Sequence, residues 1–223
     1  MEAIKENGKM YIFRQTLSNH EQEMITMRKI MMFLFAIAAF GMGGCASKHM
    51  DVVTVGQNES TLADGQSAIV FFRDTVFGGA IQAPIVEAKT SGLNTDVSFV
   101  GIVSASTKIL HKTTPGKHVY VVGGELSRRL EADLAPNKFY YVRVDPRMGV
   151  FKASFAFEPI LANDEKLQKA LSGCNWVKPG ATANEWFISN KEGMKEKAEK
   201  SAERSDNNKA FLTPGQGFDA LVR

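Results

Sequence analysis

Few residues of this 223-residue chain have the types and spacings that catalysis needs, because it contains only two cysteines, four histidines and scattered serines. The nucleophilic serine of many acyl-transfer enzymes sits in a Gly-x-Ser-x-Gly turn, and the sequence has no such turn. Ser104-Ala-Ser-Thr-Lys108 lacks the Ser-x-x-Lys spacing of another group of serine enzymes. The sequence therefore gives little support for an enzyme, and we expect a protein that is not a catalyst.

Metal binding has only three histidines to draw on after residue 44, namely His49, His111 and His118. His111 and His118 flank one predicted turn and would lie near each other across two strands. Two imidazoles with no convergent carboxylate make a weak metal site. We favour a structural role in which His118 packs its ring and hydrogen-bonds locally. The sequence therefore predicts no metal site, and nothing else in it indicates a cofactor.

Cys45 follows an ordered segment in which Arg28-Lys29 precedes an uncharged apolar run of 15 residues from Ile30 to Gly44. A membrane-spanning helix needs about 20 apolar residues, so this run has the length of a signal-peptide apolar region instead. Gly41-Met-Gly-Gly-Cys45 resembles the lipobox of bacterial lipoproteins, with Met where that pattern usually has Leu. The resemblance implies cleavage between Gly44 and Cys45 and a diacylglycerol and palmitate anchor on Cys45. The alternative is an ordinary signal peptide cleaved near Gly44-Cys45-Ala46.

The position of this segment divides the chain into five parts. Residues 1–26 mix charges without an apolar period, and we expect them to be an extension upstream of a translation start at Met24 or Met27. Residues 48–66 are rich in Gly, Ser, Asn, Asp and Thr, which is typical of a tether. The predicted parts are the extension 1–26, the signal peptide 27–44, the lipidated tether 45–66, a β-sandwich domain 67–160, and a C-terminal helical region and tail 161–223.

Charge and cysteine content narrow the possible partners. From Cys45 onward the chain keeps 22 of its 27 Lys and Arg residues and 20 of its 24 Asp and Glu residues, a net charge of +2. This balance indicates neither a nucleic-acid partner nor an acidic polymer.

With Cys45 lipidated, Cys174 stands alone in an oxidising compartment. We predict that Cys174 is a buried thiol, and the alternative is an intermolecular disulfide.

Short apolar or alternating segments, separated by turn residues, fill the region from 67 to 160. The predicted strands are 67–73, 80–88, 96–104, 107–112, 118–122, 129–134, 139–145 and 150–159. Pro84 places the second of them at an edge or a bulge. Pro115-Gly116 predicts a turn that joins 109–111 to 118–122 as a hairpin. Seven or eight short strands with frequent turns predict an antiparallel β-sandwich.

The pattern becomes helical after Ile160. A short helix is predicted near 163–173, and a longer one from about Asn184 to Arg204. The longer helix has a narrow apolar stripe formed by Phe187, Met194, Ala198 and Ala202. We interpret its Lys- and Glu-rich remainder as a solvated face supported by pairs such as Glu196 with Lys200. The alternative is a docking surface for another envelope protein. The tail from Ser205 to Arg223 is predicted to be irregular.

Motifs of the β-region resemble a known family. In chain order they are Phe72-Arg73, Pro115-Gly-Lys-His118, Leu130 to Leu134 and Pro136-Asn-Lys-Phe-Tyr-Tyr-Val142. This order resembles a family of uncharacterised bacterial envelope lipoproteins with one small β-sandwich domain, and also the small extracellular sandwiches named for a Pro-Glu-Gly-Ala motif. Asn137 stands where the lipoprotein family often has Gly. The resemblance covers roughly residues 66–160. It implies a mainly β fold, an antiparallel Ig-like or transthyretin-like β-sandwich followed by C-terminal α-helices, and no established activity.

Aromatic residues of the segment 139–145 point to two faces. Phe139 and Tyr141 lie opposite Tyr140 and Val142, and one set belongs to the core. An exposed face formed by Phe139 and Tyr141 would stack on a sugar or a partner surface. The alternative, which we prefer, is that the C-terminal helices cover that face.

The expected function is that of an outer-membrane lipoprotein that faces the periplasm and acts as a non-catalytic accessory or interaction module of the bacterial envelope. Ala46 follows the cysteine at the position where Asp usually retains a lipoprotein in the inner membrane, so the resemblance implies outer-membrane delivery. The alternative is a periplasmic lipoprotein that binds a small ligand or a glycan through the aromatic face or the end loops. The expected partners are the membrane, through the anchor, and an envelope protein, with no nucleic acid.

Overall fold

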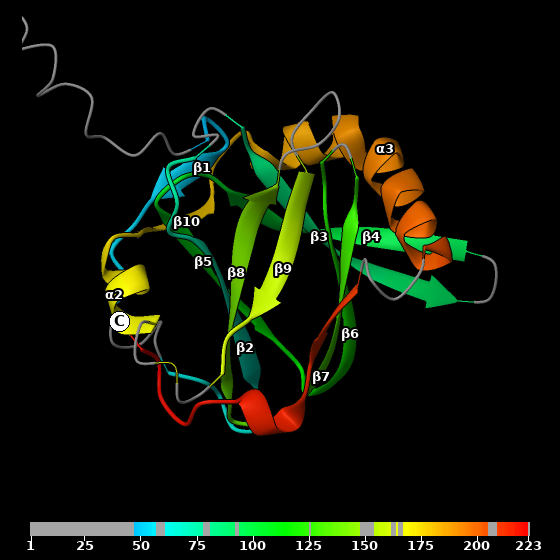
Figure 1. Ribbon diagram of the computed structural model, residues 1–223. Coiled ribbons are helices and arrows are strands. Elements are labelled where there is room, and N and C mark those ends of the chain that lie inside the picture. Colours follow the sequence, from blue (N-terminus) through cyan, green and yellow to red (C-terminus); the bar gives the residue numbers. More distant parts are fainter. Residues whose placement is uncertain are drawn as a thin grey trace, which may run out of the picture. The chain divides into compact units, whose positions relative to one another are not determined.

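Two β-sheets packed face to face make up most of the structure (Figure 1). The computed structural model of the chain describes residues 47–56, 61–77, 81–91, 94–124, 126–147, 154–161, 164, 167–204 and 209–222. The predicted extension, the signal peptide and Cys45 lie outside these residues. Among the described residues, no helix is both long enough and apolar enough to cross a bilayer.

The first sheet has six strands and is built around β2. In spatial order its strands are β1 (Met50–Val52), β10 (Asn175–Pro179), β5 (Thr107–Thr113), β2 (Ser67–Arg73), β8 (Phe139–Arg147) and β9 (Ser154–Pro159). β2 is antiparallel to β5 and parallel to β8, and β10 is parallel to β5. The sheet is therefore mixed, and the prediction of a purely antiparallel sandwich is wrong. Strands that are not consecutive in the chain, such as β2 and β8, lie side by side and run in the same direction.

The second sheet has five strands, and four of them pair in an antiparallel manner. In spatial order its strands are β11 (Lys209–Leu212), β7 (Arg128–Leu134), β6 (Gly116–Val122), β3 (Ala83–Ser91) and β4 (Asn94–Val103). β11 joins the edge parallel to β7. The register of β3 against β4 shifts between Ile85 and Val86, which agrees with the bulge predicted from Pro84.

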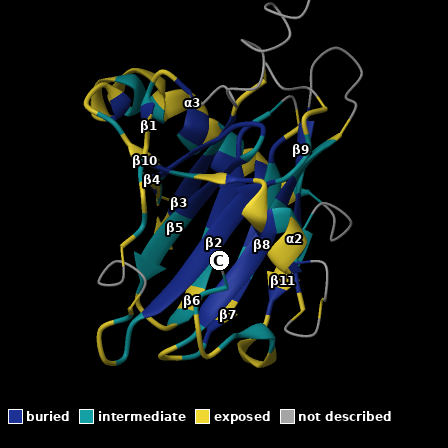
Figure 2. Ribbon diagram, turned by 90° about the vertical axis from the view of Figure 1, so that its left-hand side faces the viewer, coloured by how far each residue is buried: buried dark blue, intermediate teal, exposed yellow. Residues whose placement is uncertain are grey.

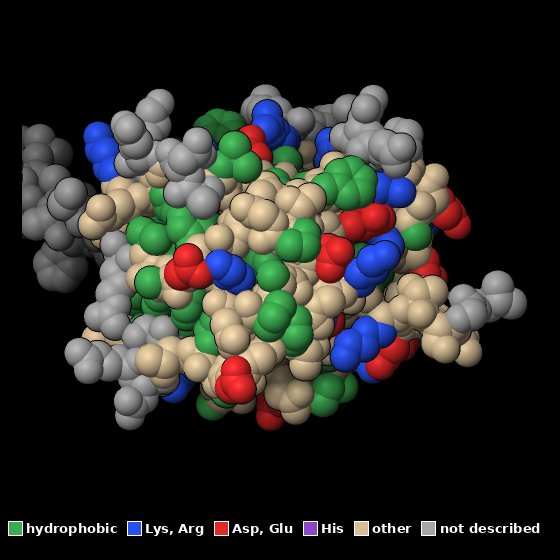
Figure 3. Space-filling model, turned by 90° about the horizontal axis from the view of Figure 1, so that it is seen from below, with side chains coloured by type: hydrophobic (Ala, Val, Ile, Leu, Met, Phe, Trp, Pro, Cys, Tyr) green, Lys and Arg blue, Asp and Glu red, His purple; other side chains and the backbone are tan. Residues whose placement is uncertain are grey.

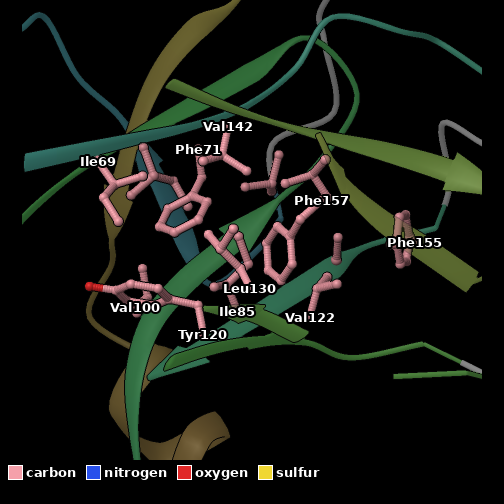
Figure 4. Close-up of a cluster of buried hydrophobic side chains, with 14 of the residues drawn as sticks. Ile69, Phe71, Ile85, Val100, Tyr120, Val122, Leu130, Val142, Phe155 and Phe157 are labelled. Atoms are coloured by element: carbon pink, nitrogen blue, oxygen red, sulfur yellow. The ribbon is translucent and has the colours of Figure 1, made fainter. Parts of the chain in front are cut away.

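The main core lies between the two sheets, where side chains of alternate residues meet. Phe71 of β2 contacts Tyr120 of β6 on the facing sheet and Phe157 of β9, with ring centroids 5.3 Å and 5.8 Å away (Figure 4). Leu130 of β7 and Val142 of β8 are fully buried in the same cluster. This interior removes the inward faces of both sheets from water, which is the dominant stabilising contribution.

The outward faces of both sheets are also covered. Helix α2 (Leu167–Ser172) and the last residues of the chain pack on the outer face of β2 and β8. Helix α3 (Ala183–Glu203) packs on the outer face of the five-stranded sheet through Met194 and Ala198. A 3-10 turn, η2 (Pro214–Gln216), follows β11. Because both of its faces are covered, β2 is an unbroken apolar run, and it is buried along its length in Figure 2.

The turn at Pro115 and Gly116 does not make a hairpin, so that prediction is wrong. β5 pairs with β2 and β10 in one sheet, whereas β6 pairs with β3 and β7 in the other. The turn therefore carries the chain from one sheet across to the facing sheet. Gly116 has φ of +105°, a conformation that glycine adopts without steric cost. A tight-turn signal is the same for both arrangements, and only the packing of the sheets distinguishes them.

Two segments predicted to be irregular form edge strands. Met50–Val52, within the predicted tether, is strand β1 and pairs in an antiparallel manner with β10. Lys209–Leu212, within the predicted tail, is strand β11. Both strands have four residues or fewer, so their own sequence pattern is weak and pairing with a preformed sheet decides their structure.

Candidate functional site

Ser47, two residues after the predicted lipidation site, is the first residue that the structure describes. The Ser47 side chain is buried, and its hydroxyl donates a hydrogen bond to Gln82 Oε1 at 3.1 Å. The Gly180 amide donates to the His49 carbonyl at 2.9 Å, and His49 Nδ1 lies 2.9 Å from Thr182 Oγ1. Gly44 and Cys45 themselves lie outside the described residues. The chain is thus fixed to the sandwich immediately after the predicted anchor, with no long spacer between them.

The connection that follows β2 presents apolar side chains to solvent. Val76 is 76 % exposed, Phe77 is 57 % exposed and Ile81 is 41 % exposed. Arg73 fixes the backbone at two of these residues, because its guanidinium donates hydrogen bonds to the Ile81 carbonyl at 2.7 Å and to the Phe77 carbonyl. Arg73 is itself fully buried over the Phe155 ring, at 5.6 Å from its centroid. We call Val76, Phe77 and Ile81 the loop patch.

Phe139 and Tyr141 do not form an exposed aromatic face, so that prediction is wrong. Both side chains are buried. Phe218 packs edge-on against Tyr141 with ring centroids 4.8 Å apart, and the Tyr141 hydroxyl accepts a hydrogen bond from the Val222 amide at 2.5 Å. Burial raises the pKa of Tyr141 to about 12. The chain end and α2 cover this face, which leaves no aromatic platform for a sugar at these two residues.

A polar cluster is enclosed where β3 and β6 lie side by side. His118 Nδ1 lies 2.8 Å from Glu87 Oε1, and His118 Nε2 lies 2.8 Å from the Thr114 carbonyl oxygen. A carbonyl oxygen only accepts hydrogen bonds, so Nε2 carries a proton and donates it to Thr114. The remaining nitrogen, Nδ1, faces the Glu87 carboxylate, so both ring nitrogens of His118 have partners within the fold.

His111 lies next to this cluster, in the core between the sheets. Its ring packs edge-on against Tyr120 at 5.6 Å, and the His118 ring stacks on Tyr120 at 6.1 Å. Burial lowers the pKa of His111, while the nearby Glu87 raises it by a smaller amount. Burial raises the pKa of Tyr120. His111 and His118 are thus close, as predicted, but within the described ranges no three His, Cys, Asp or Glu residues are arranged to hold a metal.

Cys174 is a free, buried thiol, in agreement with the prediction of a buried thiol. Its Sγ donates weak hydrogen bonds to the Arg73 carbonyl at 3.5 Å and the Ala170 carbonyl at 3.4 Å. Burial raises the pKa of the thiol to about 11. Lys108 lies nearby with its ammonium donating to the Leu171 carbonyl at 2.7 Å and placed over the Trp176 ring. A protonated, buried thiol is not a nucleophile, so this pair is structural.

Helix α3 combines one buried stripe with a charged outer face. Met194 and Ala198 of the predicted stripe are buried, but Ala202 is exposed and Ser201 is buried in its place. The predicted pair of Glu196 with Lys200 is present, and hydrogen bonding to Lys200 lowers the pKa of Glu196. The side chain of Ile188 is 65 % exposed on the same helix.

Two residues that organise these sites were missed by sequence reasoning, Glu87 and Arg73. Glu87 is a lone charge inside the apolar run Ile85-Val86-Glu87-Ala88, and Arg73 ends the apolar run of β2. A single charged residue in a strand that is otherwise buried signals a paired or clamping role, because an unpaired buried charge is costly. That signal was available in the sequence, but it does not name the partner.

Comparison with known proteins adds no family to this description. No protein-family model matches the chain, and no curated protein matches it. The site must therefore be interpreted from its own residues.

Proposed function

We propose that this chain is a lipoprotein of the bacterial outer membrane that faces the periplasm and is anchored through lipid on Cys45. The observation that carries the proposal is the position of Cys45, which ends an apolar run behind Arg28-Lys29 and comes two residues before the folded domain. A basic segment, a short apolar run and a cysteine in this order are the features that direct export and lipidation. Ala46, in place of Asp, supports delivery to the outer membrane.

The role that we propose for the folded domain is that of a non-catalytic accessory module that binds another envelope protein. The buried polar groups support this role, since His118, Lys108 and Cys174 all use their polar atoms within the fold. The outer face of α3 is the proposed contact surface, because it presents charges of both signs around the exposed Ile188. The glycan-binding alternative loses its proposed platform, because Phe139 and Tyr141 are buried.

The finer fold assignment is part of the same proposal. We propose that the sandwich belongs to the Ig-like or transthyretin-like class, with α2 and α3 as additions after β9. The support is the face-to-face packing of two sheets with a shared aromatic core. The parallel pairs β2–β8 and β10–β5 would then be elaborations of that class.

The anchor is tested by metabolic labelling with a fatty acid that carries a clickable group. The wild-type chain should incorporate the label and remain with membranes, whereas Cys45→Ala should lose both properties. A Cys45→Ala variant that is still labelled would contradict the anchor. Cys174→Ala is the matched control, because it removes the other cysteine and should leave labelling unchanged.

The proposed partner surface is tested by cross-linking in cells. A photo-crosslinking amino acid is placed at Ile188 on α3 and, as the control, at Phe211 on β11, whose side chains are 65 % and 51 % exposed. Deleting the helix would be uninformative, because Met194 and Ala198 are part of the packed structure. A recurrent envelope protein captured only from Ile188 would support the proposal. Equal capture from both positions, or none from Ile188, would contradict it.

A further inference from the structure

The loop patch is an apolar surface held in place by a buried arginine. Val76, Phe77 and Ile81 are exposed within a span of six positions, and single exposed apolar residues are ordinary whereas grouped ones indicate a contact surface. Arg73 fixes the backbone on both sides of the patch by donating to the Phe77 and Ile81 carbonyls. The exposure therefore belongs to a backbone that is anchored in the core.

The start of the folded chain lies against the same loop. Ser47 donates its hydroxyl proton to Gln82, and Gln82 directly follows Ile81. Two peptide units span at most about 7.6 Å between Cα atoms, so the covalent chain keeps Cys45 close to Ser47. Lipid carried by Cys45 therefore brings the surface of the bilayer to the end of the sandwich that bears the loop patch.

Neighbouring structure at that end carries both charged and apolar side chains: Arg147, the last residue of β8, pairs with Asp145 and Glu158 there. The Gly123 amide donates to the Pro84 carbonyl at 2.8 Å, which ties the connection after β6 to the start of β3. That connection carries Leu126, another exposed large apolar residue. β8 runs upward in Figure 1 and β2 is parallel to it, so both connections leave the upper end of the sandwich.

The opposite end is seen in Figure 3, where Lys, Arg, Asp and Glu side chains are interspersed with hydrophobic ones. Charges of both signs favour contact with water, because burying them in hydrocarbon without partners is costly.

We infer that the loop patch rests in the lipid interface of the bilayer that holds Cys45, so that the sandwich stands directly on the membrane with its opposite end toward the periplasm. The inference rests on the proposed lipid anchor. Apolar side chains of an interfacial element sit about 5–10 Å deep, at the boundary of headgroups and acyl chains. The anchor holds the patch beside the bilayer at a high effective concentration, so even a shallow contact is maintained.

The experiment uses the full-length lipidated protein, purified in detergent and reconstituted into phosphatidylethanolamine–phosphatidylglycerol vesicles. An environment-sensitive NBD dye is attached to Phe77→Cys and, in a matched control, to Phe211→Cys, which replaces a similarly exposed phenylalanine on β11. Cys174 is buried and stays unlabelled in the folded protein. A second probe at Ile81→Cys lies on the other side of the Arg73 contacts. Fatty-acid labelling is measured on the same samples.

The expected result is that the probes at Phe77 and Ile81 are blue-shifted and lose most of their emission when vesicle lipids carry an acyl-chain nitroxide. The Phe211 probe should keep its emission there and lose it to a water-soluble quencher instead. Fatty acid present with a water-quenched Phe77 probe would overturn the inference while the anchor stands. Absence of fatty acid would overturn the anchor and the inference together.

Discussion

Cys174 illustrates how burial, rather than residue type, decides reactivity in this fold. The thiol is enclosed below Arg73 and α2, and desolvation raises its pKa to about 11 although Lys108 nearby lowers it in part. In a Cys45→Ser variant with Cys174 as the only thiol, iodoacetamide at pH 8 should react far more slowly with the folded protein than with the urea-unfolded chain. Equal rates in the two states would contradict the buried, protonated thiol.

The raised pKa of the Cys174 thiol has a consequence for stability at alkaline pH. The thiol of the unfolded chain ionises near pH 9, whereas that of the folded chain ionises near pH 11. The folded state therefore binds more protons between these values, and the free energy of unfolding should fall as pH rises through this window. A Cys174→Ala variant should show a smaller decrease, as measured by urea unfolding at pH 8 and pH 10.

The pKa of His111 is lowered instead of raised, which predicts a loss of stability at acid pH. Burial lowers its pKa below the usual value, and Glu87 and His118 are the ionisable groups that act on it. As pH falls below about 6.5, the unfolded chain gains a proton that the folded chain refuses, so stability decreases. His111→Phe keeps a ring against Tyr120 and removes the titration. Thermal unfolding between pH 7 and pH 5 should then depend less on pH, and an unchanged dependence would contradict a neutral buried imidazole.

At the scale of elements, the strands that sequence predicted best are those with a complete burial pattern. β2, β4, β5, β6, β7 and β8 agree with their predicted ranges within two residues, because their apolar or alternating residues reflect the faces that they bury. β1, β10 and β11 were missed, because strands of three to five residues carry too little pattern and form by pairing at existing strands. Periodicity is a property of one segment, whereas pairing is a property of two.

The candidate site also combines features that one segment of the sequence encodes with features that depend on contacts between segments. The proposed lipidation motif at Cys45 is local in sequence and stays a prediction, whereas Arg73 with Phe77 and Ile81, and Glu87 with His118, join residues through the fold. Asn137 is an intermediate case. It replaces the glycine expected from the resemblance, and it adopts φ of +58°, a conformation that glycine and asparagine tolerate best. Both glycine and asparagine can adopt the positive φ that this turn requires. The sequence therefore indicated a departure from the family pattern at a position where the backbone conformation suits either residue.

Helix α3 provides a prediction that separates its buried stripe from its solvated face. Ala198 is buried against the five-stranded sheet, whereas Ala202, one turn later, is exposed. Ala198→Asp would place a charge in an apolar contact and should reduce the free energy of unfolding by about 3 kcal/mol or more. Ala202→Asp should change it by about 0.5 kcal/mol, because surface substitutions have small effects.

Urea unfolding of the two variants measures this difference. Both substitutions put an acidic residue near the C-terminus of the helix, so the unfavourable interaction with the helix dipole is similar and cancels in the comparison. Similar destabilisation by the two variants would mean that α3 does not pack on the sheet through Ala198. It would also remove the basis for treating the rest of the helix as a free outer face.

For the whole molecule, the main consequence is that the chain joins the fold almost at once after the predicted anchor. Met50 is buried over Gly101, and its sulfur accepts a hydrogen bond from the Ile102 amide at 3.4 Å. A Cβ at Gly101 would approach the Met50 methyl to 3.1 Å and Ile109 Cδ1 to 2.6 Å, so a side chain there would compete with both residues. Residues 47–52 of the stretch predicted as a tether are therefore a structural part of the sandwich.

This integration predicts a stability effect that a flexible tether would not show. Met50→Ala should reduce the free energy of unfolding by about 2–4 kcal/mol, because it removes buried methylene and sulfur contacts and leaves a cavity. Val52 is the matched control, since it lies two residues later in β1 with its side chain exposed, and Val52→Ala should change stability by about 0.5 kcal/mol. Urea unfolding of the Cys45→Ser background measures both. If Met50→Ala is as neutral as Val52→Ala, then β1 is not part of the cooperative fold. A flexible spacer could then separate the lipid from the loop patch, and the loop patch would not be held against the bilayer.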